Sequence, residues 1–253
     1  MYKGACGDVM PLILSLLGLL LSMLASATDM RQLSLLTEDY PPFNMPGDKP
    51  GEVAGIATEI VQQLMVRSGY TYKVRLYPWQ RAISTAQAVP DNCVFSMSRT
   101  PERERLYSWV GPLLQYDWVM FAREYDAWAA TADTLEAFKE KRIGSYQGDA
   151  IVSWLQERGY KLDIAVRDDA NPRKLLAGRI DLWATGALAG QYILRQQNIT
   201  DIVPRLTFHR SSMYLACHRD LPADEVKHLN HELQQMREDG SICAIYKRNG
   251  YIP

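Results

Sequence analysis

A turn that combines two hydroxyls with an arginine is the segment of this sequence best suited to hold a small anion. Ser98, Thr100 and Arg103 lie together in the segment FSMSRTPERE. An arginine guanidinium matches a carboxylate with paired donors, and the start of a helix offers unpaired backbone N–H groups. We therefore expect this turn to open a helix and to bind the carboxylate of a small acid. The alternative is an ordinary surface helix with Thr100 as N-cap, Pro101 in its first turn and Arg103 in solvent.

The elements that must position this turn follow from the hydrophobic pattern. Short apolar runs alternate with segments whose apolar residues recur at helical spacing. Two successive sets of this kind predict an α/β fold, each set forming a mostly parallel sheet flanked by helices. The expected strands are 33–37, 72–77, 93–97, 118–122, 142–146, one near Ile164, 180–185, 202–206 and 212–217. The expected helices are 55–67, 78–86, a short one that starts at 133–136, 148–158, 172–178, 187–196, 226–236 and 241–247.

Ligands of open α/β sheets bind beyond the carboxyl ends of the strands. The segments in which binding residues are expected are therefore the loops 38–44, 78–81, 98–103, 147–150 and 185–188.

Composition excludes several classes of function. The chain has 253 residues, 47% of them hydrophobic, and a net charge of -1 from 28 basic and 29 acidic residues. No basic run alternates with aromatic residues, so nucleic acid is not an expected partner. No cysteine spacing typical of a metal site is present, and His228 with His231 is expected to be a solvated pair, so we expect neither metal nor cofactor. No nucleophile elbow or phosphate-binding glycine loop indicates an enzyme.

The N-terminal segment is typical of a secretory signal peptide. An apolar run at 11–24 precedes the small residues Ala25, Ser26 and Ala27, which predicts cleavage after Ala27 and a periplasmic, soluble mature protein. The alternative is an uncleaved anchor, although an apolar core of roughly 15 residues is short for a membrane span. Met1 or Met10 could be the start.

Export would place three cysteines, Cys93, Cys217 and Cys243, in an oxidising compartment. Because three is an odd number, at least one stays unpaired within the chain. Cys217 could pair with Cys243, or all three could be buried, reduced residues.

Five segments in order resemble the family 3 periplasmic solute-binding proteins, the amino-acid-binding components of ABC importers. They are PPF at 41–43, GIATEIVQQL at 55–64, SRTPERE at 98–104 leading into WVGPL, AGRIDL at 177–182, and the closing LNHELQQMREDGSICAIYKRNGY. The resemblance implies a type II periplasmic-binding fold, in which two lobes joined by crossovers near Ala122 and His209 close by a hinge around one small ligand. The implied lobes are 28–121 with 210–253, and 122–209, after a signal peptide at 1–27. It also implies a monomer that delivers its ligand to an ABC permease in the inner membrane.

The resemblance also implies roles for individual residues. Ser98, Thr100 and Arg103 would hold the ligand's α-carboxylate, and aromatic residues would flank its side chain unless they belong to the core. The turn that opens the second lobe would supply further N–H donors. The implied site is Arg103, Ser98, Thr100, Glu38, Tyr40, Phe43, Trp79, Arg81, Tyr146, Gln147, Gly148, Asp149 and Thr185.

One departure from the family pattern concerns the ligand's amino group. Where the family usually carries a second aspartate to pair the ligand's ammonium, this chain has Gly186. Either Glu38 supplies the negative charge from the first loop, or the ligand has no α-amino group. Arg81 either binds a second acidic group or is an exposed helix residue, and Asp181 is expected to be structural.

Three functions remain open at this stage. The first is a binding protein without chemistry that captures a small carboxylate-bearing, amino-acid-like solute. The second is an enzyme on the same scaffold, similar to cyclohexadienyl dehydratases, with Glu38 as the general acid or base. The third is a sensor-associated binding protein that presents its ligand to a receptor.

Overall fold

The computed structural model describes residues 31–250. The signal peptide expected at 1–27 and the alternative start at Met10 lie outside the described residues. Contacts group the described residues from Gln32 onward into one compact unit. Among the described residues, no helix has the length and apolar content needed to cross a membrane.

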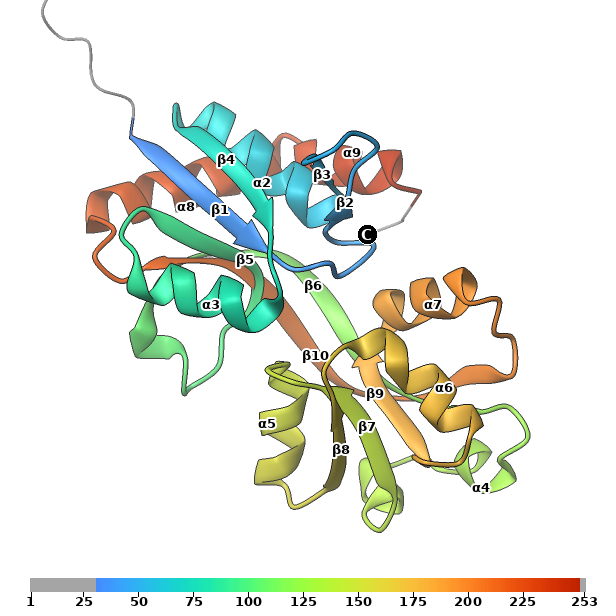
Figure 1. Ribbon diagram of the computed structural model, residues 1–253. Helices are drawn as coiled ribbons and strands as arrows, with labels where there is room; N and C mark the ends of the chain where they lie inside the picture. The colour runs from blue at the N-terminus through green and yellow to red at the C-terminus, as the bar shows by residue number, and fades with distance from the viewer. Residues whose placement is uncertain (1–30, 251–253) are drawn as a thin grey trace, which may run out of the picture. The chain divides into compact units, whose positions relative to one another are not determined.

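One mixed sheet of eight strands organises this unit, in the order β4-β1-β5-β10-β6-β9-β7-β8 (Figure 1). β1 pairs in parallel with β4 and β5, and β7 pairs in parallel with β8 and β9. The pairings of β10 with β5 and β6, and of β6 with β9, are antiparallel. The strands are β1 (Gln32–Thr37), β4 (Thr71–Leu76), β5 (Asn92–Ser98), β6 (Tyr107–Arg123), β7 (Arg142–Tyr146), β8 (Lys161–Ala165), β9 (Leu182–Gly186) and β10 (Ile202–His218), with a small hairpin of β2 (Met45–Pro46) and β3 (Val53–Ala54).

Helices connect and cover these strands in two groups. We call residues 32–106 and 219–250 the first half, and residues 124–201 the second half. The first half contains α2 (Ile56–Arg67), α3 (Trp79–Ala88), α8 (Ala223–Glu238), α9 (Ser241–Arg248) and the 3-10 helix η1 (Glu104–Leu106). The second half contains α4 (Ala127–Ala130), α5 (Ala150–Glu157), α6 (Asn171–Leu176), α7 (Ala187–Gln196) and the 3-10 helices η2 (Leu135–Phe138) and η3 (Asp168–Ala170).

Two long strands, β6 and β10, run between the halves (Figure 1). Each has 17 residues, and they pair from Tyr107 with His218 to Arg123 with Ile202. The prediction of separate strands at 202–206 and 212–217 was wrong, because pairing with β6 continues through the polar residues between them. The crossovers expected near Ala122 and His209 fall within these strands, and the division into lobes at those residues stays a prediction.

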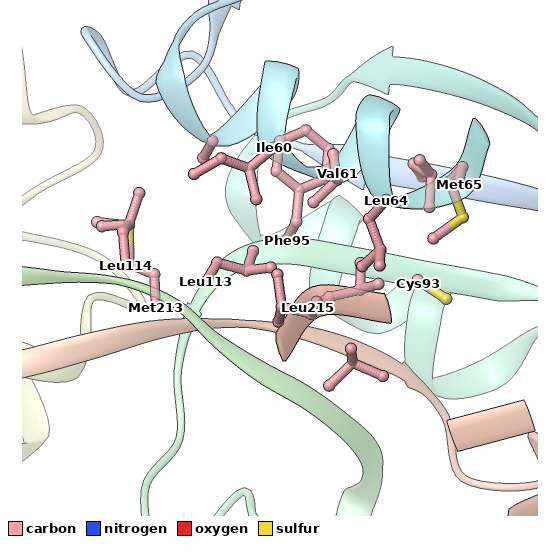
Figure 2. Packing of buried hydrophobic residues seen from close by; sticks show 14 of the residues in the cluster. Ile60, Val61, Leu64, Met65, Cys93, Phe95, Leu113, Leu114, Met213 and Leu215 are labelled. Carbon is pink, nitrogen blue, oxygen red and sulfur yellow. The ribbon is translucent and has the colours of Figure 1, made fainter. Parts of the chain in front are cut away.

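The core of the first half fixes the loop that follows β1. Helix α2 turns Ile60, Val61 and Leu64 onto Phe95 of β5 (Figure 2). Before the helix, Gly55 has φ +112, and a Cβ there would lie 2.6 Å from the Phe43 carbonyl oxygen. Residues 40–44 therefore pack against the start of α2, whose first N–H groups donate to the carbonyls of residues 42 and 43.

A disulfide joins Cys93 and Cys217. These residues face each other in the β5–β10 pairing, whereas Cys243 lies on α9 and is free. Both alternatives that the sequence left open, a Cys217–Cys243 pair and three reduced cysteines, are wrong. The deciding contact joins residues 124 apart in the sequence, so local pattern could not reveal it.

Candidate functional site

The turn after β5 does not open an α-helix. The 3-10 helix η1 has three residues, and β6 begins directly after it. The expected helix fails to form because Tyr107 already starts the long strand that pairs with β10. Helix-terminal N–H groups are thus not available at this turn, and its capacity to bind an anion rests on the Arg103 side chain.

Arg103 reaches from the first half to the second. Its Nη1 donates to the Ser98 carbonyl at 3.2 Å, and its Nη2 donates to the Gly148 carbonyl at 2.9 Å. Ser98 is 5% exposed, and its hydroxyl shares a hydrogen bond of 2.8 Å with the Tyr116 hydroxyl. The guanidinium is therefore held by two backbone carbonyls at the wall of a cavity.

This cavity has a volume of about 20 Å³, close to the space that one ordered water needs. Four of the five predicted loops contribute to it, namely those after β1, β4, β5 and β7. A cavity at the carboxyl ends of strands is where α/β sheets bind ligands. Its lining consists of Glu38, Tyr40, Trp79, Ser96, Ser98, Arg103, Tyr116, Tyr146, Asp149, Ala150 and Met213.

Two carboxyl groups face the same cavity. The Tyr146 hydroxyl donates to Glu38 Oε1 at 2.9 Å, and burial raises the pKa of Glu38 to about 8. Asp149 is the N-cap of α5 and accepts from the Ile151 N–H at 3.0 Å. Burial raises the pKa of Asp149 to about 7, although Arg103 and the N-terminal N–H groups of α5 oppose the rise. The site thus combines one arginine with two carboxyls that bind protons near neutral pH.

A third carboxyl, Asp168, does not line the cavity but lies close enough for its charge to act on Glu38 and Asp149, and it was not predicted. Its Oδ1 accepts from Trp183 Nε1 at 2.7 Å and from Asn171 Nδ2 at 3.1 Å, and its Oδ2 accepts from the Thr185 hydroxyl at 2.6 Å. Burial raises the pKa of Asp168 to about 6. The sequence signal that could have indicated a role for Asp168 is its position just after the carboxyl end of β8.

Within residues 31–250, no group of three His, Cys, Asp or Glu residues is arranged to hold a metal ion.

Family comparison settles what kind of chain carries this site. The model of the bacterial extracellular solute-binding proteins, family 3, matches residues 34–250. The chain belongs to this family. Comparison with curated proteins gives no match.

Several solved structures share the fold of this family 3 protein. A histidine kinase sensor domain with similarity to periplasmic binding proteins aligns with a TM-score of 0.79 and 23% identity, covering 88% of this chain and 99% of that chain. An ancestral arginine-binding protein bound to arginine gives 0.73 and 19%, covering 86% and 97%. An ancestral amino-acid-binding protein that is a precursor of cyclohexadienyl dehydratase gives 0.72 and 19%, covering 86% and 94%. The expected type II periplasmic-binding fold is confirmed.

Several residues that the resemblance implied lie outside the cavity lining of this family 3 protein. Phe43 is 1% exposed in the core of the first half, with its ring edge-on to Tyr116 at 6.2 Å. Arg81 is exposed and stacks over the Tyr77 ring at 4.2 Å. Thr100 and Gln147 do not line the cavity, and Thr185 acts through Asp168.

The surroundings of Gly186 leave no space for an aspartate side chain at this position of the family 3 protein. A Cβ at Gly186 would lie 2.5 Å from the Tyr40 hydroxyl and 3.3 Å from the Tyr116 ring. Tyr40 thus fills the space that a side chain would need, and the carboxyls near the cavity come from Glu38, Asp149 and Asp168. Asp181 instead accepts from Arg142 N–H at 2.9 Å at the start of β7, in keeping with the expected structural role.

Proposed function

We propose that this protein is exported to the periplasm and captures a small carboxylate-bearing, amino-acid-like solute for delivery to an ABC transporter. The observation that carries the proposal is the position of Arg103 in the same cavity as Glu38 and Asp149. A guanidinium recognises a carboxylate, and a carboxylate recognises an ammonium, so the site complements a ligand that carries both. Membership of the family supports a solute-binding role.

The arrangement favours Glu38 as the partner of the ligand's ammonium, whose positive charge would lower the pKa of Glu38 from about 8 and ionise the carboxyl on binding. Glu38 accepts a hydrogen bond from Tyr146 across the two halves, so its carboxyl is oriented before any ligand binds. Asp149 adds a second carboxyl to the cavity lining. Rings of Tyr40, Trp79 and Tyr116 complete the walls and would pack against the ligand's apolar atoms.

A thermal-shift screen of the purified protein tests this proposal. Amino acids, polyamines, dicarboxylates and other organic acids are added in turn, because a ligand that binds only the folded state raises the melting temperature. We expect zwitterionic amino acids to raise it more than dicarboxylates do. The absence of a shift from any carboxylate, or an equal shift in wild type and Arg103→Ala, would contradict the proposal.

A second candidate function rests on the raised pKa of Glu38. A carboxyl with a pKa of about 8 is mostly protonated at neutral pH and faces the cavity, which suits a general acid. A neighbour by fold is a precursor of cyclohexadienyl dehydratase. Conversion of a cyclohexadienyl acid that Glu38→Gln abolishes would favour this function, whereas stabilisation by that acid without product would favour binding alone.

The downstream partner is tested separately, in cells. Deletion of the protein should abolish uptake of the ligand that the screen identifies, if an ABC permease is the partner. Retained uptake, with loss only of a transcriptional response to that ligand, would favour a sensor partner instead.

A further inference from the structure

Two side chains of the first half donate to one backbone carbonyl of the second half. The Gly148 carbonyl, in the turn between β7 and α5, accepts from Trp79 Nε1 at 2.9 Å and from Arg103 Nη2 at 2.9 Å. Both donors belong to the first half, in the segments that follow β4 and β5. A carbonyl oxygen has two lone pairs, so its accepting capacity is filled by these two bonds.

The Gly148 carbonyl and its two donors are each held in place by contacts within their own half. The Gln147 N–H donates to the Ala165 carbonyl at 2.9 Å, and Asp149 caps α5, so the Gly148 carbonyl between them has a set direction. Trp79 is 8% exposed and packs in the cluster of α3 with β5. Arg103 is anchored by the Ser98 carbonyl. Side-chain entropy is thus largely lost before the halves meet, which strengthens the contact between them.

A side chain at Gly148 would crowd the first half. Its φ is +82, and a Cβ there would lie 2.0 Å from Gln80 Nε2 and 3.0 Å from Trp79 Cδ1. The Gln80 amide is the end of a flexible side chain and can move. The Trp79 ring is buried and hydrogen-bonded to the Gly148 carbonyl, so the few tenths of an ångström that it must give strain the contact between the halves.

We propose that the Gly148 carbonyl, with Trp79 and Arg103, is a latch that closes the two halves on each other through protein groups alone. This inference rests on the proposed function for its purpose, since the cavity beside the latch is the ligand site. Each bond joins two protein atoms and needs no bridging ligand atom. Arg103 then has two tasks: it closes the latch through Nη2, and it places its remaining N–H groups at the cavity wall.

The latch has a consequence for ligand entry. The space that it encloses is about 20 Å³, so an amino-acid-sized molecule enters only after the bonds to Gly148 break or Arg103 shifts. Opening of the latch is therefore a step on the binding route. A variant that cannot close it should bind faster and release faster than wild type.

Small-angle X-ray scattering of the full mature protein, without added ligand, tests the latch. We expect Gly148→Ala to show a larger radius of gyration than wild type. The matched control is Gly159→Ala, because Gly159 has φ +75 but its Cβ would make only ordinary contacts, at 3.7 Å and beyond. Both variants carry the same backbone strain, so both should lose about 2–4 °C of melting temperature, but the control should keep the wild-type radius.

A second variant guards against a folding defect in Gly148→Ala. Trp79→Phe keeps an aromatic ring and removes the indole N–H, so it should give a smaller increase in radius. Wild-type radii for both Gly148→Ala and Trp79→Phe, or an equal increase in Gly159→Ala, would overturn the proposal. Because the measurement uses no ligand, a negative ligand screen would reject the proposed function and leave this result standing.

Discussion

The Tyr40 hydroxyl lies 2.5 Å from the point where a Cβ of residue 186 would stand. Tyr40 belongs to the loop after β1, and Gly186 ends β9. A loop of the first half therefore limits the size of the side chain at position 186 in the second half. The Tyr40 ring in turn stacks on Phe43 with centroids 5.7 Å apart, which stops it from turning away.

Substitution of Gly186 should therefore act through Tyr40. Gly186 does not have a positive φ, so alanine is tolerated by the backbone and only the collision remains. We expect Gly186→Ala to lower the free energy of unfolding by about 1–3 kcal/mol, as overpacking does. Removing the hydroxyl in Gly186→Ala/Tyr40→Phe should restore most of that loss in denaturant titrations. Full additivity of the two single effects would show that the residues do not collide.

Loss of Arg103 should remove most of the affinity for a carboxylate ligand. Arg103→Ala is expected to weaken binding by about 2–5 kcal/mol, since the ligand's carboxylate would be buried without a partner. Calorimetric titration with the best carboxylate of the screen measures the change. Arg105→Ala is the control, because Arg105 is exposed in η1 and should leave affinity unchanged. Similar affinities for wild type and Arg103→Ala would reject the assignment of the carboxylate site.

Stability should fall as pH rises from about 4 to about 8. Burial raises the pKa of Glu38 to about 8, of Asp149 to about 7 and of Asp168 to about 6, whereas carboxyls in unfolded chains titrate near 4. The folded protein thus binds more protons than the unfolded chain in this window, and its free energy of unfolding decreases with pH. The contribution is complete below about pH 4 and is lost as pH passes through the folded pKa values.

Melting temperatures measured between pH 5 and pH 9 check this dependence. Glu38→Gln stays neutral throughout, so its profile should be flatter than that of wild type. Asp48→Asn changes an exposed carboxyl and should keep the wild-type slope. An unchanged slope in Glu38→Gln would show that this carboxyl is ionised in the folded protein at neutral pH.

Loss of the Asp168 carboxyl should lower the free energy of unfolding more than loss of the exposed Asp169 carboxyl. Asp168→Ala leaves the Trp183 indole N–H and the Thr185 hydroxyl without their acceptor in a buried site. We expect a loss of about 3 kcal/mol or more in the free energy of unfolding. Asp169→Ala breaks only a surface ion pair with Arg167 and should lose less than about 1 kcal/mol. Equal effects of the two variants in chemical denaturation would contradict this account.

Much of the fold was predictable because its signals are local. Helix α7 occupies the predicted 187–196, and α2 begins directly after Gly55, since apolar spacing and glycine positions report on neighbouring residues. The same pattern located the loops that line the cavity. Long-range pairing gives no local signal. The residues after Ser98 are typical of a helix start, but the segment that follows them forms β6 and pairs with β10.

The sequence by itself determined the alternation of strands and helices and four of the loops that line the cavity, including the turn that carries Arg103. Only the tertiary structure decided that Cys93 joins Cys217, that Asp168 anchors Thr185, and that Tyr40 takes the space beside Gly186. Periodicity is set by the direction in which consecutive side chains point, whereas these contacts depend on which strands become neighbours. Which strands become neighbours depends on the burial of apolar surface over the whole molecule, so it cannot be predicted from any single segment.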